Sequence, residues 1–530
     1  MAISLFNAWV ITFAGFFYDS SQPITIPPNV GNHFVEQSTL DARQWGVKGN
    51  GLDDDTDAIQ ALIDQAEDTE IIFDGGEYLI NGTIILKSGC KVIGKNGAIV
   101  KAGPAMTGTM LKYGRFFSLN NVDKCSITGL KFLSRKAAFQ LSGWSDACIY
   151  VYNSTNSIID NNSFEFDQPY GISGAEAVWV SGPKSKNTVI KNNIVSGLGI
   201  KYAENGASFT SVQDNKIVNA HSNALTANGN SDVRITGCQI LNNLVENAGR
   251  IGIEDWGDVD GTLIEGNTIS GTGKDPDQAH EGFGISAVGI NTTIKNNKIF
   301  DARIYYLEIG GNHNVVAENN EISDPSGEGT GIMLNFTDKV PLPLTEGTSK
   351  VSGSSISNCD RAIQIYGSYK PVCSVVNNTV KNPKSRGISI ESDAPYFNIE
   401  LHDNQFIVEN QTKVFRSIIN NYCSLPAGSV DQRLIVRSNK VYYAPSANSG
   451  SGFDLTLLIL ADGAQIIDNE IIGNDVRSGG YPIHAIASNG GTANNLTIAR
   501  NKISGALVDL KGYKHTVLDN NEFSQARNFE

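Results

Sequence analysis

Two glutamates, Glu254 in GRIGIEDWGDVDG and Glu308 in RIYYLEIGG, occupy the same place relative to a recurring asparagine of this 530-residue chain. Each lies eleven positions beyond that asparagine and follows an apolar residue that strand alternation directs inward. We therefore expect both carboxylates on one outer face, two strands apart, with the small Ser286 between them. At a strand spacing of ~4.8 Å their backbones lie about 9 to 10 Å apart.

This spacing suits one kind of chemistry. Carboxyl groups ~6.5 to 9.5 Å apart are typical of inverting glycoside hydrolysis, in which one acid protonates the leaving oxygen and the other activates water. We expect Glu254 and Glu308 to be that pair, with Asp255 as a third catalytic carboxylate. Taken singly, however, an outward glutamate on such a surface is more often only a solvated carboxylate.

The residues near this pair would suit a sugar groove, because carbohydrate CH faces stack on aromatic rings and inserted loops form groove walls. An eight-residue insertion within GKDPDQAHEG brings His280 and Glu281 towards the pair. The expected substrate-binding residues are Arg250, Trp256, Asp258, His280, Ser286, Tyr306 and Trp179.

Two other functions stay open. A polysaccharide lyase needs a base to remove the proton α to a uronate carboxyl and a cation to neutralise that carboxylate. Tyr306 or His280 could be the base, and Arg250 the cation. A non-catalytic adhesin would use the groove for binding alone. The net charge of −14 favours hydrolysis over the lyase, because it would repel a polyuronate.

The elements that must position these residues follow from a repeat of the form apolar, x, x, Asn, x, apolar. Adjacent copies lie 20 to 35 residues apart, and looser copies occur at ITGLKF and VSGSSI. The asparagines of the thirteen strict copies are Asn162, Asn193, Asn215, Asn243, Asn267, Asn297, Asn320, Asn378, Asn404, Asn439, Asn469, Asn501 and Asn521.

The segments between the asparagines are short and rich in β-branched residues, as in TVIKNN and LTIARNKI, which is typical of strands. Asparagine tolerates a left-handed backbone and suits a tight bend between two strands. Stacked bends would place asparagine over asparagine in a ladder. The repeat therefore predicts an all-β fold, a single-stranded parallel β-helix.

Aligning the strand after each corner extends the row that holds the two glutamates. Because the apolar neighbour in each copy points inward, the aligned residue points outward. The expected row contains Ser173, Thr226, Glu254, Ser286, Glu308, Met333, Gln364, Ser389 and His484.

A helix is expected before the coils, because Ile59, Leu62, Ile63 and Ala66 recur at helical spacing. The acidic residues 53–57 would cap it and supply first-turn carboxylates. It would cover the open end of the solenoid, which an unprotected strand edge requires. The acidic cluster lacks the glycine and the distal glutamate of a calcium loop, so we expect no metal there.

The segment GVKGNGLDDDTDAIQALID, with IIFDGGEYLI and GTIILKSGCKVIGK after it, resembles the N-terminal signature of the pectate-lyase-like superfamily, in the branch of phage tailspike depolymerases. The resemblance is specific over residues 41–94 and generic over the coils. It implies a right-handed parallel β-helix, often homotrimeric, that acts on cell-surface polysaccharide. Asp74-Gly75 replaces the usual Pro-Pro, and the N-T-D, G-H-G and R-I-K motifs of polygalacturonases are absent, which disfavours pectin hydrolysis.

Composition bounds the partners. The chain has no basic block, so nucleic acid is not expected, and its seven cysteines form no C-x-x-C pair, so neither a disulfide framework nor a zinc site is indicated. We expect no cofactor. The expected partners are a bacterial surface polysaccharide, two further copies of the chain in a homotrimer, and a phage tail or baseplate protein.

The first residues need separate treatment. Residues 3–17 are apolar, but fifteen residues are short of the ~20 that a membrane helix needs. The first basic residue is Arg43, which disfavours a secretory signal. We divide the chain into residues 1–40, an attachment or oligomer-contact segment, residues 41–100, the capping helix and first coils, and residues 101–530, the β-helix. The expected location is a virion tail or the extracellular space.

Overall fold

The structure is a computed structural model of the chain. It describes residues 39–66, 68–106, 114–134, 146–166, 175–229, 232–311, 313–337, 347–367, 369–392, 394, 396–410, 415–421, 431–448, 454–473, 483–489, 491–524 and 526–527. Residues 1–38, most of the predicted attachment segment, lie outside the described residues.

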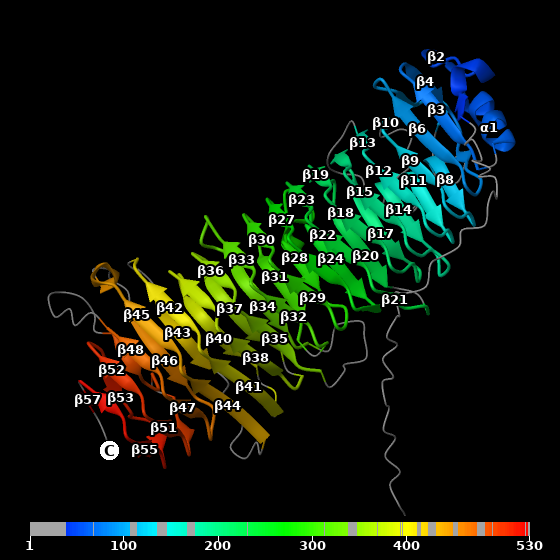
Figure 1. Cartoon of the computed structure of the whole chain (residues 1–530). Helices are drawn as coiled ribbons and strands as arrows, with labels where there is room; N and C mark the ends of the chain where they lie inside the picture. Colours follow the sequence, from blue (N-terminus) through cyan, green and yellow to red (C-terminus); the bar gives the residue numbers. More distant parts are fainter. Residues whose placement is uncertain are drawn as a thin grey trace, which may run out of the picture. The chain divides into compact units, whose positions relative to one another are not determined.

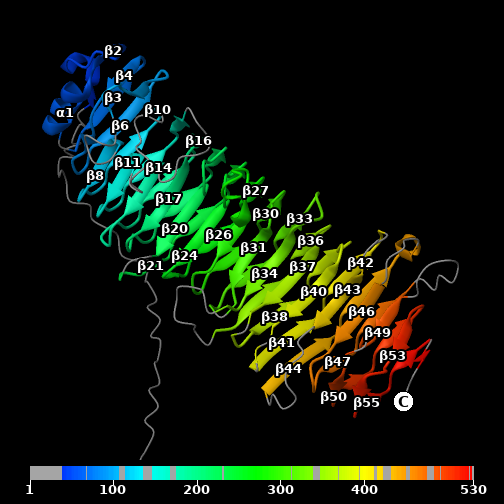
Figure 2. The ribbon, with the colours of Figure 1, turned by 180° about the vertical axis from the view of Figure 1, so that it is seen from behind.

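The chain winds in successive coils, and each regular coil gives one strand to each of three long parallel sheets, which we call A, B and C (Figure 1). In one coil these strands are β29 (Thr293–Lys295), β30 (Lys298–Phe300) and β31 (Tyr305–Gly310). The view from behind in Figure 2 shows the same stacking of coils in chain order. The predicted right-handed parallel β-helix is confirmed.

The strands of each sheet follow one another in chain order. Sheet C, which carries the candidate site, contains β5 (Ile84–Ile85), β8 (Arg115–Asn120), β11 (Asp146–Tyr152), β14 (Ala175–Ser181), β17 (Gly199–Glu204), β20 (Leu225–Gly229), β24 (Ile253–Gly257), β28 (Ile285–Ala287), β31, β34 (Thr330–Asn335), β37 (Arg361–Tyr366), β40 (Arg386–Glu391), β43 (Arg416–Asn421), β46 (Asp454–Ile459), β49 (His484–Ile486), β53 (Leu507–Asp509) and β57 (Ala526–Arg527).

Sheet A contains β1 (Thr39–Asp41), β3 (Glu70–Asp74), β6 (Lys91–Lys95), β9 (Ser126–Thr128), β12 (Ile158–Asp160), β15 (Val189–Lys191), β18 (Ser211–Gln213), β22 (Gln239–Leu241), β26 (Leu263–Glu265), β29, β32 (Val316–Glu318), β35 (Ser349–Ser352), β38 (Val372–Val376), β41 (Tyr396–His402), β44 (Asp431–Arg437), β47 (Gln465–Ile467), β51 (Thr497–Ala499) and β55 (Val517–Asp519). Sheet B contains β2 (Asn50–Asp54), β4 (Glu77–Ile80), β7 (Ile99–Ala102), β10 (Lys131–Ser134), β13 (Ser163–Phe166), β16 (Ile194–Ser196), β19 (Lys216–Val218), β23 (Leu244–Glu246), β27 (Thr268–Ser270), β30, β33 (Glu321–Ser323), β36 (Ser355–Ser357), β39 (Thr379–Lys381), β42 (Gln405–Val408), β45 (Lys440–Tyr443), β48 (Glu470–Ile472), β52 (Lys502–Ser504) and β56 (Glu522–Phe523). Two short pairs, β21 (Ile235–Thr236) with β25 (Val259–Asp260) and β50 (Ala493–Asn494) with β54 (Tyr513–Lys514), complete the described strands.

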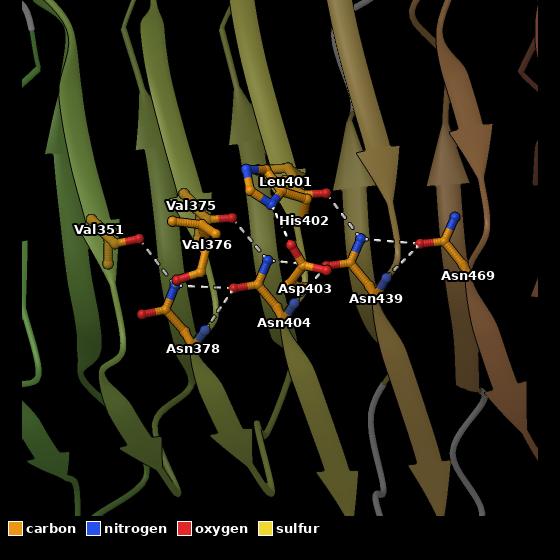
Figure 3. Close-up of polar contacts among 10 residues, drawn as sticks. All are labelled: Val351, Val375, Val376, Asn378, Leu401, His402, Asp403, Asn404, Asn439 and Asn469. Atoms are coloured by element: carbon orange, nitrogen blue, oxygen red, sulfur yellow. Dashed lines mark hydrogen bonds and ion pairs between the residues drawn. The ribbon is translucent and has the colours of Figure 1, made fainter.

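The corner between sheets A and B carries the predicted ladder. The backbone N–H and the Nδ2 of Asn297 both donate to Oδ1 of Asn320 in the next coil, at 3.1 and 3.0 Å. Its Nδ2 also donates to the carbonyl of Ile264 in the preceding coil, at 3.0 Å. Figure 3 shows this pattern running from Asn378 through Asn404 and Asn439 to Asn469. All thirteen predicted asparagines take part.

The left-handed residue of the corner is the one before the ladder asparagine. Asn296 has φ of 57°, and glycine stands at the equivalent positions Gly266 and Gly353, with φ of 70° and 62°. The expectation that the ladder asparagine itself would be left-handed is wrong. Its side chain is buried and bonds to neighbouring coils, while its predecessor makes the bend.

The predicted capping helix is α1 (Thr56–Gln65), which packs Ile59, Leu62 and Ile63 into the core. The N-cap residue of α1 is Asp55, which makes no side-chain capping bond, and Oδ1 of the preceding Asp54 accepts hydrogen bonds from the backbone N–H and the hydroxyl of Thr56, at 2.9 and 2.5 Å. Within the described part of the chain, neither α1 nor any other helix has the length and apolarity needed to cross a bilayer.

The ladder gives a first prediction. Asn297→Ala removes the acceptor of the buried backbone N–H of Asn267, while the Nδ2 of Asn267 keeps the carbonyls of Ile240 and Glu265 as acceptors. Each buried donor left without a partner costs about 1 to 3 kcal/mol, so we expect a marked fall in the denaturation midpoint. The midpoint of Asn297→Ser should fall less, because Ser354 already occupies one position of the ladder and its Oγ accepts a hydrogen bond from the backbone N–H of Asn320.

Asn296→Gly is the matched control. It changes the neighbouring asparagine, and glycine already occupies this corner position at Gly266 and Gly353. Its midpoint should stay near that of the wild type. Equal midpoints for Asn297→Ala and Asn296→Gly in chemical denaturation would contradict the role of the ladder.

Candidate functional site

The outward row on sheet C is the one that the sequence predicts. Register pairs join Thr226 to Glu254, Glu254 to Ser286, and Ser286 to Glu308 on the strands β20, β24, β28 and β31. The row continues through Met333, Gln364 and Ser389. Glu254 and Glu308 therefore lie two strands apart with Ser286 between them, as predicted.

Of two outer members of the predicted row, one lies outside the described residues and the other falls elsewhere. Ser173 lies outside the described residues, and Lys201 is the register partner of Thr226 in the preceding coil. Beyond Ser389 the row continues through Asn420. His484 pairs with Leu455, and Leu455 pairs with Ser417 rather than with Asn420. The prediction for His484 is wrong because the alignment misplaced it along the strand.

A cleft of about 270 Å³ opens over the two glutamates. Its wall residues come from β24, β28, β31 and β34, from residues next to β24, β28 and β34, and from the inserted loop between β27 and β28. They are Arg250, Ile251, Glu254, Trp256, Glu281, Phe283, Ser286, Val288, Glu308, Asn335 and Thr337. Of the predicted site residues, Arg250, Glu254, Trp256, Ser286 and Glu308 thus meet in one cleft.

Glu254 is held by one cation and two neutral donors. Arg250 Nη1 lies 3.4 Å from its Oε1, and its Oε2 accepts hydrogen bonds from Asn223 Nδ2 at 2.5 Å and from the Thr226 hydroxyl at 2.9 Å. Burial raises the pKa of Glu254, while the guanidinium of Arg250 and the hydroxyl of Thr226 oppose that rise. Glu254 as a residue is 9% exposed, so its side chain faces the cleft without being freely solvated.

Among the described residues, the direct partners of Glu308 are neutral. Its Oε2 accepts from the Ser286 hydroxyl at 2.7 Å, and its Oε1 accepts from Asn335 Nδ2 at 3.1 Å. Burial raises the pKa of Glu308, and these two hydrogen bonds only partly offset it. A carboxyl without a directly bonded cation is easier to protonate than one beside a guanidinium.

Arg250 links the inserted loop to the outward row of sheet C. Its Nε pairs with Glu281 at the end of the short 3₁₀ helix Ala279–Glu281, while its Nη1 reaches Glu254. The same loop is fastened to the preceding coils, because Ser222 donates to Gln278 Oε1 at 2.8 Å. The cleft wall is therefore tied to the strands beneath it by charge and by hydrogen bonds.

Asp255 and Tyr306 lie inside the coil and do not line the cleft. Asp255 is fully buried, and its carboxylate accepts hydrogen bonds from the hydroxyls of Thr262 at 3.0 Å and Thr292 at 2.8 Å. Tyr306 is also fully buried, and the partly exposed neighbour is Tyr305, whose ring lies 5.0 Å from that of Phe283. The expectation that Tyr306 would bind substrate beside the two glutamates is wrong, because alternation breaks at the start of β31, where Tyr306 and Leu307 are both buried.

Three further predicted binding residues lie outside the cleft. Asp258 pairs with Arg234 at 2.6 Å, and His280 is exposed on the inserted loop. Trp179 is buried three strands upstream in the same row, where Lys201 Nζ lies 3.7 Å from the ring centroid and the indole N–H donates to Glu204 at 2.9 Å.

The sequence interpretation missed the amide donors. Asn335 follows Met333 of the predicted row by two positions, so the same alternation would have placed it outward beside Glu308. Asn223 carries no such signal, because it precedes β20 in an irregular segment. Phe283 directly follows the inserted loop, which we expect to form a groove wall. Its aromatic side chain at that position could have indicated it as a wall residue.

Comparisons with known proteins were consistent with this architecture. A family model described as rhamnogalacturonase A/epimerase, pectate lyase-like, matches residues 40–254, and one described as a right-handed β-helix region matches residues 237–406. The chain is a pectate-lyase-like β-helix protein. The predicted superfamily is thereby confirmed, and the two matches together span the cleft.

Solved structures of this pectate-lyase-like fold include PfbA, a surface adhesin of Streptococcus pneumoniae, with 16% identity over 70% of this chain and 91% of that chain and a TM-score of 0.50. A tailspike protein of E. coli bacteriophage HK620 has 11% identity, covers 92% of this chain and 79% of that chain, and has a TM-score of 0.41. At such identities the likeness shows the fold alone.

A curated relative matches a short part of this pectate-lyase-like chain. It is a probable glucan endo-1,3-beta-glucosidase of Arthroderma benhamiae, 44% identical over 57 residues, which are 11% of this chain and 6% of the relative. The match therefore spans a small fraction of the relative's length.

Asp255 gives a prediction for stability. Burial raises its pKa from 3.8 to about 6, although the hydroxyls of Thr292 and Thr262 oppose the rise. Because the folded pKa lies above the unfolded one, the contribution to stability is complete below about pH 4 and is lost as the pH rises through about 6. Asp255→Asn stays neutral, so its denaturation midpoint should fall less than that of the wild type between those values.

Asp260→Asn is the control, since Asp260 is partly exposed and lies 3.3 Å from Arg234. It should leave the pH dependence as in the wild type. A constant difference between the midpoints of the wild type and Asp255→Asn across the same pH range would contradict the assignment.

Proposed function

We propose that the cleft on sheet C hydrolyses a glycosidic bond of a polysaccharide, with Glu308 as the general acid and Glu254 as the general base. The observation that supports this most directly is the pair of buried carboxylates two strands apart, which open into one cleft with an aromatic side chain and a cation. Backbones about 10 Å apart leave room for a water between the carboxyl groups, as inverting hydrolysis requires.

The two roles follow from the contacts of each carboxyl. Arg250 stabilises the ionised form of Glu254, which suits a base that takes a proton from water. Glu308 receives only neutral hydrogen bonds in a buried setting, which suits an acid that keeps its proton until the glycosidic oxygen leaves. Trp256 and Phe283 offer ring faces on which a sugar can stack.

The lyase alternative has less support. Of its three groups only Arg250 lines the cleft, because Tyr306 is buried and His280 lies outside the wall. The adhesin alternative is favoured by a different observation, since the chain shares its fold with a surface adhesin over 91% of that protein. Binding without cleavage is therefore the second candidate.

The substrate in this proposal is a bacterial surface polysaccharide such as capsule, O-antigen or exopolysaccharide, and the chain acts outside the cell or on a virion tail. The names of the matching family and relatives, which include a rhamnogalacturonase, a glucosidase and a tailspike, motivate a glycan substrate without identifying it. Asp255 acts in this proposal by fixing the strand that carries Glu254, rather than by touching the sugar.

The mechanism predicts the effect of two substitutions. Glu308→Gln and Glu254→Gln keep shape and much of the hydrogen bonding but remove the titrating group. General acid or base catalysis contributes about 10² to 10⁴ in rate, so each variant should lose at least ~10²-fold in kcat. Glycan binding should survive, because Trp256, Phe283 and Arg250 remain. A glycan panel with reducing-end assays and product mass analysis measures both properties.

Glu265→Gln serves as the control, because Glu265 pairs with Lys295 on sheet A, away from the cleft. It should retain wild-type activity. Products with unsaturated uronate ends would favour the lyase, and tight binding without any product would favour the adhesin. Full activity in both glutamine variants would move the site elsewhere.

The proposal includes a homotrimer with the residues before 41 as its attachment or contact segment. The apolar stretch 3–17 and the scarcity of basic blocks support self-association over binding to a polyanion. Light scattering at micromolar concentration should give three chain masses, and a single chain mass would contradict this assembly.

A further inference from the structure

The polar face of sheet C continues past Glu308, where an aromatic, an amide and a guanidinium side chain replace the carboxylates. Asn335, which lines the cleft, is the register partner of Tyr366 on β37, and Tyr366 is 44% exposed. The strand β37 also presents Gln364 in the row of Glu308, and Arg361 at its start. An aromatic ring, an amide and a guanidinium therefore follow the catalytic pair along the same face.

Arg361 retains unused hydrogen-bonding capacity. Its side chain is 38% exposed, and its Nε lies 3.7 Å from Glu391 Oε1, too far for a hydrogen bond. That Nε is buried and donates to no acceptor within the described part of the chain. Glu391 is instead held by neutral donors, Gln364 Nε2 at 2.7 Å and the Ser389 hydroxyl at 3.1 Å.

A second guanidinium lies beside the first. Arg386 on β40 is the register partner of Arg361, so the two backbones are about 4.8 Å apart. Arg386 is held by the backbone carbonyls of Ser385 and Phe415, at 3.0 and 3.4 Å, and its guanidinium carbon lies 5.4 Å from the ring centroid of Phe415. Arg361 thus has Glu391 as its nearby carboxylate, while Arg386 lies on the neighbouring strand.

The cleft itself has the opposite balance. Three carboxylates, Glu254, Glu281 and Glu308, face it with one cation, Arg250. Such a cleft disfavours an anionic sugar at the point of cleavage, because like charges in a poorly solvated site repel. The face thus separates a carboxylate-rich cleft from an arginine-bearing region two strands further along.

We propose that Arg361, Gln364 and Tyr366, with Arg386 beside them, form a distal subsite for a carboxylate-bearing sugar. The guanidinium fork of arginine matches a carboxylate in two parallel hydrogen bonds, and Tyr366 supplies a ring face for the sugar. The distal subsite deepens the proposed function and rests on it in one respect, because the same glycan must contact both the cleft and the distal subsite. β37 lies two strands from β31, so the acidic sugar is about 10 Å from Glu308.

The subsite assigns a substrate class. A homopolymer of uronates would put carboxylates into the cleft, and a neutral polymer would offer no carboxylate to Arg361. The arrangement fits a heteropolysaccharide in which a neutral sugar occupies the cleft and an acidic sugar lies further along the chain.

The test uses the purified full-length protein and three short probes, sialyllactose, sulfated lactose and lactose, with dissociation constants from titration. Sialyllactose should bind more tightly than lactose. Arg361→Gln should weaken the binding of sialyllactose at least ~10-fold, because a charge-assisted hydrogen bond is lost, and should leave the binding of lactose unchanged. Arg361→Lys should be intermediate, because it keeps the charge without the fork.

Two more variants sharpen the test. Glu391→Gln should tighten sialyllactose binding, because it removes a competing carboxylate, while Tyr366→Ala should weaken both sialyllactose and lactose. Matched controls lie on other sheets: Arg433→Gln changes a 57% exposed arginine paired with Glu400 on sheet A, and Tyr442→Ala changes a 44% exposed tyrosine on sheet B. Neither control should alter binding.

Several outcomes would overturn the subsite. These are equal affinity of the wild type for sialyllactose and lactose, unchanged sialyllactose binding by both Arg361 variants, and weaker binding by Glu391→Gln. Sulfated lactose bound as tightly as sialyllactose would contradict selection for a carboxylate. Because the titration requires no cleavage, a protein that binds sialyllactose as expected but hydrolyses nothing would refute the proposed hydrolase while leaving the subsite in place.

Discussion

The structure depends on one repeated interaction, the donation of a buried backbone N–H in one coil to the side-chain oxygen of an asparagine in the next. A parallel β-helix has a corner in every coil where backbone groups leave the sheets, and a buried donor without a partner is costly. The ladder from Asn162 to Asn521 supplies that acceptor coil after coil. Its geometry also fixes the rise between coils, because each side chain bonds both to the coil before and to the coil after.

That fixed rise is what makes an outward row of sheet C a candidate site. Side chains such as Glu254, Ser286 and Glu308 come from coils of different lengths, yet they align in register because their coils start from the same ladder. The inserted loop before β28 changes the coil length without shifting Ser286 out of the row. Loops can therefore vary around the cleft while the separation of the two carboxylates is preserved.

The sequence predicts the ladder and the order of the row because both rest on periodicity, which local chemistry imposes on every coil. It predicts poorly where alternation breaks. Tyr306 and Leu307 are both buried at the start of β31, although Tyr306 stands two positions before the outward Glu308. The partners of the glutamates were also hard to predict, because Asn223 lies in an irregular segment and reaches Glu254 from a neighbouring coil. Such contacts depend on how irregular segments approach the neighbouring coil, which the periodicity of the sequence does not encode.

Asp255 shows how the interior supports the surface row. A carboxyl buried among apolar residues is unfavourable unless its hydrogen bonds are satisfied, and here two threonines from successive coils donate to it. Its backbone carbonyl accepts from the N–H groups of Val288 and Gly289, at 3.0 and 3.1 Å, and Val288 lines the cleft. Asp255 thus joins its own coil to the next one through both its side chain and its backbone carbonyl. We infer that this buried polar group is retained because it holds two cleft side chains in place, a role that a well-packed apolar residue without hydrogen bonds would not perform.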